Sequence, residues 1–353
     1  MQTEHSLYYA DAREMWAVAD ESVELVVTSP PYPMIEMWDQ TFIRQNSSIG
    51  AALEAGDGSR AFEAMHRVLD PVWEEVGRVL RPGGFACINI GDAARKVGEE
   101  FMLYPNHARV LLSLYENGLS PLPAILWRKQ TNAPNKFMGS GMLPAGAYVT
   151  LEHEYVLILR KGGRRAFVTP AQKARRYRSA IFWEERNRWF SDIWLDLKGT
   201  RQQMQEKEVR SRSGAFPLDL PYRLISMYSV AGDTVLDPFL GAGTTCFAAM
   251  AAARSSIGLE LEAGFFPAIR RAAENVVDAG NKIVSERLAG HEEFVRQRLA
   301  EGKELKYRSR FYGFPVMTRQ ETDIWFHRPE RIESKGADRF VVSCRAAEDG
   351  LSR

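Results

Sequence analysis

A glycine-containing stretch, Asp237-Pro-Phe-Leu-Gly-Ala-Gly-Thr-Thr245, could seat a ligand at the end of a strand. Strand-forming residues 233–236 precede it and small helix-forming residues follow it, which places the turn where ligands bind in open α/β sheets. Gly241 and Gly243 allow a close backbone approach, and the next helix begins with free N–H groups. The stretch lacks the third glycine of a dinucleotide motif and the lysine of a P-loop. Asp237 therefore indicates a ligand with a cationic or amine-bearing part, although such a turn can also simply close a strand–helix junction.

A second loop, Thr28-Ser-Pro-Pro-Tyr32, follows the apolar run 23–28, which is typical of a strand buried on both faces. Its two prolines fix φ and remove two N–H groups, so the loop is stiff and lined with hydrogen-bond acceptors. Ser29 and the Pro30 carbonyl can accept hydrogen bonds from an exocyclic amine, and Tyr32 offers a flat face for a stacked base. The alternative is a surface motif for a WW-type partner, which the preceding buried strand disfavours.

Two further carboxylates end strand-like segments. Glu260 lies about twenty residues past the glycine turn, where a carboxylate can accept both hydroxyls of a ribose. This favours a nucleoside-bearing cofactor, and the missing phosphate pattern favours S-adenosylmethionine over NAD. Asp11 could accept a hydrogen bond from an adenine amino group, or it could cap a helix. Glu260 could also be an ordinary surface acid, and Phe239 could be plain core packing.

Composition limits the classes of protein that the chain can belong to. With 353 residues, 45% of them apolar, it can bury one large core and an accessory lobe. A net charge of +1 confines any nucleic-acid site to a local patch. Three scattered cysteines make neither a disulfide framework nor a metal site, so no metal is expected. No apolar run approaches membrane-spanning length and the first residues lack a signal layout, so we expect a cytoplasmic protein with no membrane partner.

Strand-like and helix-like segments alternate, which predicts an α/β fold with a mostly parallel sheet. We expect a helical insertion over residues 33–70 and an irregular tail over 301–330. The final 23 residues look weakly ordered at their end and receive no role. The expected strands cover 6–10, 23–28, 85–90, 124–127, 153–160, 233–236 and 256–260, and the expected helices cover 12–19, 71–80, 105–117 and 265–300.

The stretch 160–212 differs in composition from the rest of the chain. It has fifteen Lys or Arg against six Asp or Glu, with aromatic residues between them. This composition is typical of a DNA-contacting region, although it also fits a solvated charged face. The insertion 33–70 and the tail 301–330 could likewise touch DNA, stabilise a dimer or simply pack. The candidate DNA-binding residues are Arg164, Arg165, Lys173, Arg175, Arg176 and Arg178.

With both loops in view, the chain resembles the β-class amino DNA methyltransferases, which use S-adenosylmethionine. The loop 28–32 looks like their catalytic motif and the stretch 237–245 like their cofactor motif, and the catalytic motif comes first, as in the β class. Weaker matches span most of residues 5–275. The resemblance implies a Rossmann-like methyltransferase fold with a circularly permuted motif order and a small DNA-recognition region. The implied units are a catalytic half (1–159), a target-recognition region (160–214), a cofactor-binding half (215–275) and a C-terminal extension (276–353).

The resemblance also assigns roles to residues. Its implied catalytic residues are Ser29, Pro30, Pro31 and Tyr32, and its implied cofactor-binding residues are Asp11, Thr28, Asp237, Pro238, Phe239, Gly241, Gly243, Thr244, Thr245 and Glu260. Because a sulfonium methyl is already activated, we expect no covalent intermediate and assign Cys87 and Cys246 to the core. The sequence names no obvious base for the amine proton.

The expected function is transfer of a methyl group to cytosine N4 in double-stranded DNA, because the Ser-Pro-Pro-Tyr form usually accompanies that base. Adenine N6 is the alternative within the class. An RNA or small-molecule methyltransferase and an inactive DNA-binding protein are the alternatives from other classes. The protein would be a monomer or homodimer in a restriction–modification system, with a cognate endonuclease as a possible partner but not a stable subunit.

Overall fold

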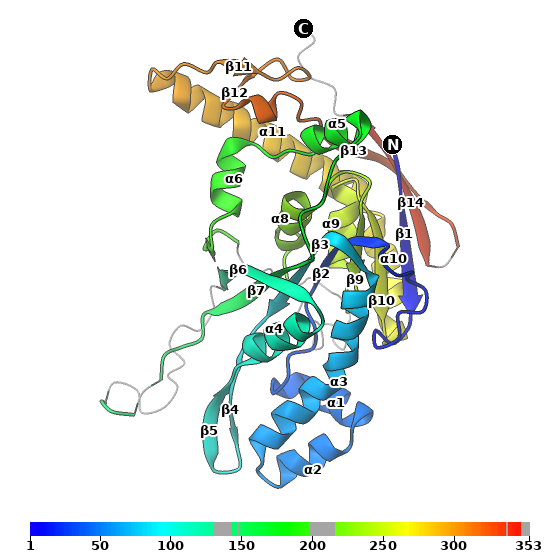
Figure 1. Ribbon diagram of the computed structural model, residues 1–353, viewed down its shortest axis with the longest axis vertical. Helices are drawn as coiled ribbons and strands as arrows, with labels where there is room; N and C mark the ends of the chain where they lie inside the picture. Colours follow the sequence, from blue (N-terminus) through cyan, green and yellow to red (C-terminus); the bar gives the residue numbers. More distant parts are fainter. Residues whose placement is uncertain (130–142, 147, 198–215, 337, 347–353) are drawn as a thin grey trace.

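A ten-stranded sheet forms the centre of the computed structural model, which describes residues 1–129, 143–146, 148–197, 216–336 and 338–346 (Figure 1). Its strand order is β13-β14-β1-β10-β9-β2-β3-β7-β6-β8. The five middle strands run parallel: β1 (Gln2–Tyr9), β10 (Ser255–Glu260), β9 (Thr234–Asp237), β2 (Val23–Thr28) and β3 (Leu80–Ile90). Flanking them are β7 (His153–Lys161), β6 (Leu119–Arg128), β8 (Ile193–Trp194), β14 (Arg339–Ala346) and β13 (His327–Ser334). The predicted α/β fold with a mostly parallel sheet is confirmed.

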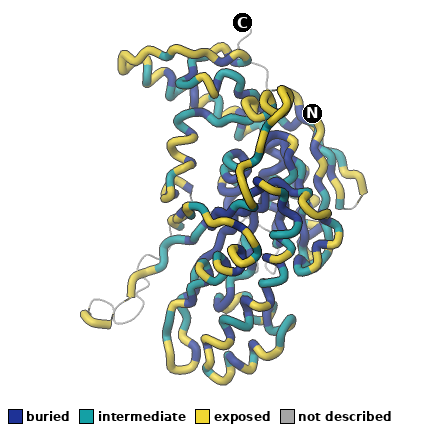
Figure 2. Tube along the Cα trace, in the orientation of Figure 1, coloured by how far each residue is buried: buried dark blue, intermediate teal, exposed yellow. Residues whose placement is uncertain are grey.

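Helices cover both faces of this sheet, and the middle strands are buried between them (Figure 2). Every residue of β2 is buried, as its apolar run predicts. Because side chains alternate along a strand, Val26 packs with helices α3 (Gly58–Val79) and α4 (Asn106–Glu116), whereas Leu25 and Val27 pack with α8 (Asp219–Tyr228) and α9 (Thr244–Ala251). The sheet and the helices on its two faces thus make three layers. The carboxyl ends of the parallel strands β1, β10, β9 and β2 lie together at one edge of the sheet.

The helical insertion is present, but its boundaries differ from the prediction. It comprises the 3-10 helix Glu36–Trp38, helices α1 (Asp39–Gln45) and α2 (Ser48–Glu54), and the first turns of α3. Pro71 does not begin a new helix, because α3 continues through it to Val79. Buried Leu69, Val72 and Trp73 lie on one face of this helix, so packing outweighs the hydrogen bond that Pro71 cannot donate. The sequence also did not predict the hairpin of β4 (Ala93–Val97) and β5 (Glu100–Tyr104).

One prediction near the start of the chain is wrong, and the C-terminal hairpin is an element that the sequence did not predict. Residues 12–19 form turns and no helix, because the Asp11 side chain accepts a hydrogen bond from Arg13 N and closes a local turn. The described part of the final 23 residues is ordered in β13 and β14, and β14 pairs antiparallel with β1. Alternate residues Phe340, Val342 and Cys344 of β14 are buried. The C-terminal end therefore extends the central sheet.

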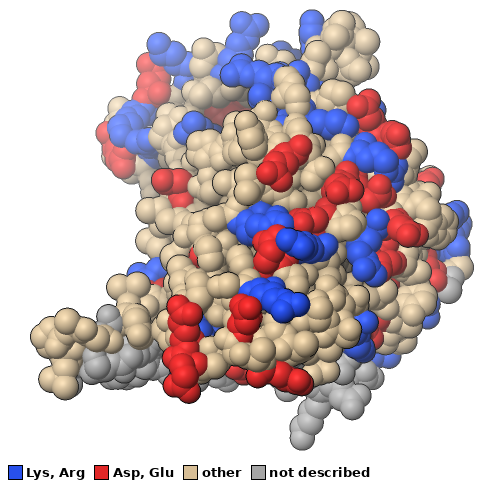
Figure 3. Space-filling model, turned by 60° about the horizontal axis from the view of Figure 1, so that its bottom comes forward, with Lys and Arg blue, Asp and Glu red and all other residues tan. Residues whose placement is uncertain are grey.

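The remaining helices stand around this framework. Helix α5 (Pro170–Arg178) and helix α6 (Trp183–Trp189) belong to the basic stretch, and α10 (Phe266–Ala273) and α11 (Val276–Ala300) follow β10. Short strands β11 (Tyr307–Arg308) and β12 (Pro315–Val316) lie along α11 (Figure 1). Acidic and basic side chains are interspersed on the face shown in Figure 3, in agreement with ion pairs such as Arg95–Asp39 and Arg109–Asp70. None of the helices described has the length and apolar character needed to cross a membrane.

Candidate active site

A cleft of about 640 Å³ opens at the carboxyl ends of β1, β2, β9 and β10. Both predicted loops line it, although more than two hundred residues separate them in the chain. The predicted site residues on its wall are Asp11, Ser29, Pro30, Pro31, Tyr32, Asp237, Pro238, Phe239, Gly241, Thr244 and Glu260. Three other predicted residues, Thr28, Gly243 and Thr245, do not line the cleft. They lie behind the wall and hold it in place.

Asp237 ends β9 at the back of the cleft, where it is almost fully buried. Its Oδ1 accepts hydrogen bonds from Thr28 Oγ1 at 2.5 Å and from Phe239 N at 3.1 Å. Burial raises the pKa of Asp237 to about 6, against the lowering effect of its hydrogen bonds. Thr245 Oγ1 donates to the Val27 carbonyl at 3.2 Å, and its side chain is also among the groups that act to lower the pKa of Asp237. A carboxylate buried in this way favours a cationic ligand in front of it.

The glycine turn has the backbone geometry that its sequence predicts. Gly241 and Gly243 have φ values of 51° and 83°, in the left-handed region where side chains are strained. Gly243 precedes the first residue of α9, and a Cβ there would meet Phe247 and Ile269 at 3.2 and 3.3 Å. The turn therefore requires glycine at this position and directs the start of α9 at the cleft.

Glu260, at the end of β10, holds the glycine turn through a hydrogen bond. Its Oε2 accepts from Gly241 N at 2.7 Å and its Oε1 accepts from Glu262 N at 2.8 Å. Burial raises the pKa of Glu260, despite these backbone bonds. Each carboxylate oxygen has a second acceptor site, so Glu260 can still accept two hydroxyls from a ligand. This geometry argues against an ordinary surface acid.

Asp11 has a different environment from the one expected. Both of its oxygens bind the Arg13 side chain, at 2.6 to 3.0 Å. Burial acts to raise the pKa of Asp11, but the hydrogen bonds from Arg13 outweigh it, so the pKa lies below its usual value. Because Asp11 caps no helix, that alternative is wrong. A contact from Asp11 to a ligand would have to share the carboxylate with Arg13, which also lines the cleft.

A polar network lies directly behind the Ser-Pro-Pro-Tyr loop. Ser29 Oγ donates to the Tyr32 hydroxyl at 3.0 Å, and this hydroxyl donates to Glu154 Oε2 at 3.0 Å. Asn89 Nδ2 donates to the Tyr32 hydroxyl at 2.8 Å and to Glu154 Oε2 at 2.7 Å. Lys129 Nζ binds the other carboxylate oxygen, Glu154 Oε1. The Tyr32 ring lines the cleft while its hydroxyl is held by this network.

Sequence reasoning assigned no role to Asn89, Glu154 or Lys129. Glu154 is a charged residue directly before the mostly apolar run 155–159 of β7, and Asn89 interrupts the apolar end of β3. A polar side chain at a buried strand position is a signal that could have pointed to them. Which partner each one meets depends on the pairing of β7 beside β3, which the sequence does not show.

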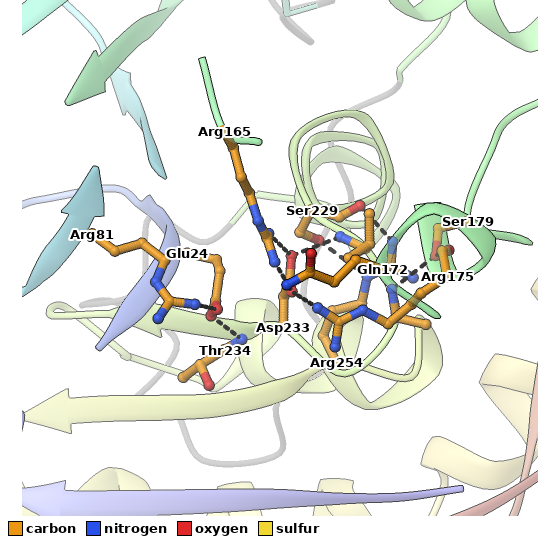
Figure 4. A network of polar contacts seen from close by, with 12 residues as sticks. Glu24, Arg81, Arg165, Gln172, Arg175, Ser179, Ser229, Asp233, Thr234 and Arg254 are labelled. Atoms are coloured by element: carbon orange, nitrogen blue, oxygen red, sulfur yellow. Dashed lines mark hydrogen bonds and ion pairs between the residues drawn. The ribbon is translucent and has the colours of Figure 1, made fainter. Parts of the chain in front are cut away.

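Two of the candidate DNA-binding residues at the start of the basic stretch pair with a carboxylate away from the cleft. Arg165 binds Asp233 through two hydrogen bonds of 2.6 and 3.0 Å, and Arg175 lies 3.6 Å from the same carboxylate (Figure 4). Asp233 precedes β9, so this network is at the amino ends of the strands, opposite to the cleft. Arg165 and Arg175 thus serve to hold the α5 segment on the core.

The other four candidates of this group are exposed: Arg164, Lys173, Arg176 and Arg178. Arg176 lies over Phe167 and Arg178 over Trp325, with the guanidinium carbon 5.0 and 4.8 Å from the ring centre. Lys173, Arg176 and Arg178 belong to α5, like Arg175, and Arg164 precedes Arg165. None of them lines the cleft. Residues 198–214, which end the expected target-recognition region, lie outside the described residues.

Comparison with known proteins identifies the family. The DNA methylase family pattern matches residues 23–271. Type II methyltransferase M.MthZI of Methanothermobacter thermautotrophicus is 50% identical, over 93% of this chain and 92% of its own length. Type II methyltransferase M.MjaI of Methanocaldococcus jannaschii is 48% identical, over 76% and 90%. The crystal structure of TTHA0409 from Thermus thermophilus, complexed with S-adenosyl-L-methionine, has 32% identity and a TM-score of 0.60, over 77% of this chain and 94% of that one. The chain therefore belongs to the DNA methylase family, in agreement with the resemblance that its two loops indicate.

Proposed function

We propose that this DNA methylase transfers a methyl group from S-adenosylmethionine to the exocyclic N4 of cytosine in double-stranded DNA. Its similarity to two type II methyltransferases supports a role as the modification enzyme of a restriction–modification system. The reaction needs a seat for the methyl donor, a hydrogen-bonding site for the amine and an opening wide enough for a single base. The cleft has a candidate for each.

The hydrogen bonding of Ser29 is the observation that supports an exocyclic amine as the group that receives the methyl. Ser29 Oγ donates its proton to the Tyr32 hydroxyl, so its lone pairs are free to accept a hydrogen bond from an amine in the cleft. An aromatic amine is a poor nucleophile because its lone pair is delocalised into the ring. Hydrogen bonds from the amine to Ser29 Oγ and to the Pro30 carbonyl favour a pyramidal nitrogen with its lone pair directed at the methyl group. A neutral serine at this position supports cytosine over adenine, as in the family pattern.

The residues of the cleft fit S-adenosylmethionine. The buried Asp237 carboxylate favours a positive charge, and Glu260 retains free acceptor sites for ribose hydroxyls. The N–H groups at the start of α9, near Thr244, suit a carboxylate. When bound there, the cofactor supplies an activated methyl group, and the protein supplies orientation. Such positioning accounts for much of the rate in displacement reactions.

The target base must leave the duplex to reach this cleft. We propose that DNA lies across the carboxyl edge of the sheet, on the side of Ser29, and that Tyr32 lines the pocket for the flipped base. Described basic residues at this edge include Arg128, the last residue of β6, and Lys129, which lines the cleft. Arg165 and Arg175 lie at the opposite edge and are not part of this proposal.

Mass spectrometry of nucleosides from methylated DNA tests the proposal. We expect N4-methylcytosine from DNA incubated with the wild type, and none after Ser29→Ala. N6-methyladenine alone would replace cytosine with adenine as the target. Methylation of RNA or a small molecule but not of duplex DNA would contradict the substrate class. Absence of all methyl transfer with retained DNA binding would indicate an inactive DNA-binding protein. Methylation-aware sequencing of host DNA would then give the recognition site.

A further inference from the structure

A continuous hydrogen-bonded path leads from Ser29 to a buried carboxylate. Ser29 Oγ donates to the Tyr32 hydroxyl, and the Tyr32 hydroxyl donates to Glu154 Oε2, each at 3.0 Å. Asn89 fixes this direction, because its amide nitrogen can only donate and it contacts both the Tyr32 hydroxyl and Glu154 Oε2. The Tyr32 oxygen thus receives two hydrogen bonds, and its own proton must point to Glu154.

The far end of the path is a carboxylate held away from bulk water. Glu154 is 9% exposed and also lines the cleft. The titratable and charged groups that contact it among the described residues are Tyr32, from the loop after β2, and Lys129, after β6; Asn89 of β3 adds a neutral amide. The Lys129 ammonium balances the charge of the buried carboxylate. Burial and the charge of Glu154 raise the pKa of Tyr32 well above its usual value, so this phenol can pass on a proton without remaining ionised.

Methyl transfer to an amine creates a proton that has to leave. The nitrogen lone pair forms the new N–CH₃ bond while the electron pair of the C–S bond departs with sulfur. The nitrogen then carries a positive charge and two protons, and losing one of them restores a neutral methylated amine. Since Ser29 Oγ is the proposed acceptor of the amine hydrogen bond, it is also the first atom that this proton can reach.

We propose that Tyr32 and Glu154 form the exit path for this proton. The amine gives a proton to Ser29 Oγ, Ser29 gives its own proton to the Tyr32 hydroxyl, and Tyr32 gives its proton to Glu154 Oε2. Each relay group ends with as many protons as it had, and Glu154 ends as the neutral acid until it releases the proton to water. This inference rests on the proposed function only in needing an amine at Ser29, whether it belongs to cytosine or to adenine.

Single-turnover methylation by Glu154→Gln, at saturating DNA and S-adenosylmethionine, tests the relay. The glutamine keeps the size of the side chain but cannot take up the proton. We expect the rate to fall by about tenfold to a hundredfold, less than the full effect of a direct general base because water can substitute in part. The pH profile of the rate should also differ between the wild type and the variant, because only the wild type has an ionisable group at the end of the path. Affinities for S-adenosylmethionine and DNA should remain close to those of the wild type.

Tyr32→Phe interrupts the same path in the middle and should show the same loss of rate and the same change of pH profile. Tyr155→Phe is the matched control, because it removes a hydroxyl from the neighbouring residue of β7, outside the path. A Glu154→Gln rate equal to that of the wild type would overturn the relay. So would a slower variant whose pH profile matches that of the wild type, because this result indicates a structural role alone. Identification of the methylated base in the wild-type reaction tests the proposed function independently.

Discussion

Thr28 and Asp237 are 209 positions apart in the chain, yet Thr28 Oγ1 donates a hydrogen bond to Asp237 Oδ1 across 2.5 Å. Thr28 ends β2 and Asp237 ends β9, and these strands are neighbours in the sheet. The bond therefore connects the residue before Ser29 with the first residue of the glycine turn. It fixes the distance between the proposed amine site and the proposed seat of the methyl donor, which a displacement reaction requires to be short and constant.

Thr28→Val should loosen this connection. The substitution keeps the shape of the side chain but leaves a buried acceptor on Asp237 short of one donor, which costs about 2 kcal/mol of stability for a hydrogen bond to a charged group. We expect a lower free energy of unfolding and weaker binding of S-adenosylmethionine. Thr28→Ser, which retains the hydroxyl, is the control. Chemical denaturation and calorimetric titration measure the two effects, and equal behaviour of Val and Ser variants would contradict this role.

Cofactor affinity should depend on pH through Asp237. Burial raises its pKa to about 6, so the unliganded carboxyl gains a proton as pH falls through that value. The neutral acid stabilises the folded chain below about pH 4, and this contribution is lost as pH rises through 6. A cationic ligand instead favours the ionised form of Asp237, so protonation of this carboxyl weakens its binding. We therefore expect the affinity for S-adenosylmethionine to be constant above about pH 7 and to fall by up to about tenfold per pH unit below 6.

Asp237→Asn is the control for this pH dependence. This variant should bind the cofactor weakly at neutral pH. Its affinity should also depend less on pH between pH 5 and 7, because the contribution of Asp237 is gone. Glu260, whose pKa is also raised by burial, can contribute the remainder. An unchanged slope in Asp237→Asn, measured by titration calorimetry, would assign the pH dependence to another group.

Much of this site could be predicted from short stretches of sequence. The apolar run of β2 and the glycines at 241 and 243 act locally: they define a strand end and a left-handed turn whatever surrounds them. The proline pair at 30 and 31 likewise stiffens its loop by its own covalent structure. The two loops lie in one cleft because each follows the carboxyl end of a parallel strand.

The features that sequence reasoning missed depend on strand pairing. Glu154 contacts Tyr32 and Asn89 only because β7 lies antiparallel beside β3. The C-terminal hairpin is polar at its outer strand β13 and becomes ordered by pairing through β14 with β1. Arg165 carries the same charge as a DNA-binding residue, but its partner Asp233 precedes a strand far along the chain. Composition reports the charges of a segment and does not report which partner neutralises them.

DNA affinity should respond to charge at the cleft edge and not at α5. Arg128 ends β6 beside the cleft residue Lys129, and its side chain is 56% exposed. We expect Arg128→Glu to weaken DNA binding and to reduce the slope of log affinity against log salt by about one. Arg176→Glu on α5 should change neither. Fluorescence anisotropy at several salt concentrations distinguishes them, and a larger effect of Arg176→Glu would place the DNA on the opposite face.

Asp233 and its arginines should contribute to stability and not to catalysis. The Asp233 side chain is 1% exposed and the Arg165 side chain 20%, so removing the arginine leaves a buried carboxylate whose closest guanidinium contact is lost, with Val230 N at 2.8 Å and Arg175 at 3.6 Å remaining. Arg165→Met should therefore lower the free energy of unfolding by about 3 kcal/mol, the lower end for a broken buried pair because Arg165 is partly exposed. Arg164→Met, at an exposed neighbouring position, is the control and should cost less than about 0.5 kcal/mol. At a temperature where both variants are folded, each should methylate DNA at the wild-type rate, since the pair lies at the amino ends of the strands. A loss of rate in folded Arg165→Met would instead connect this end of the sheet to the reaction.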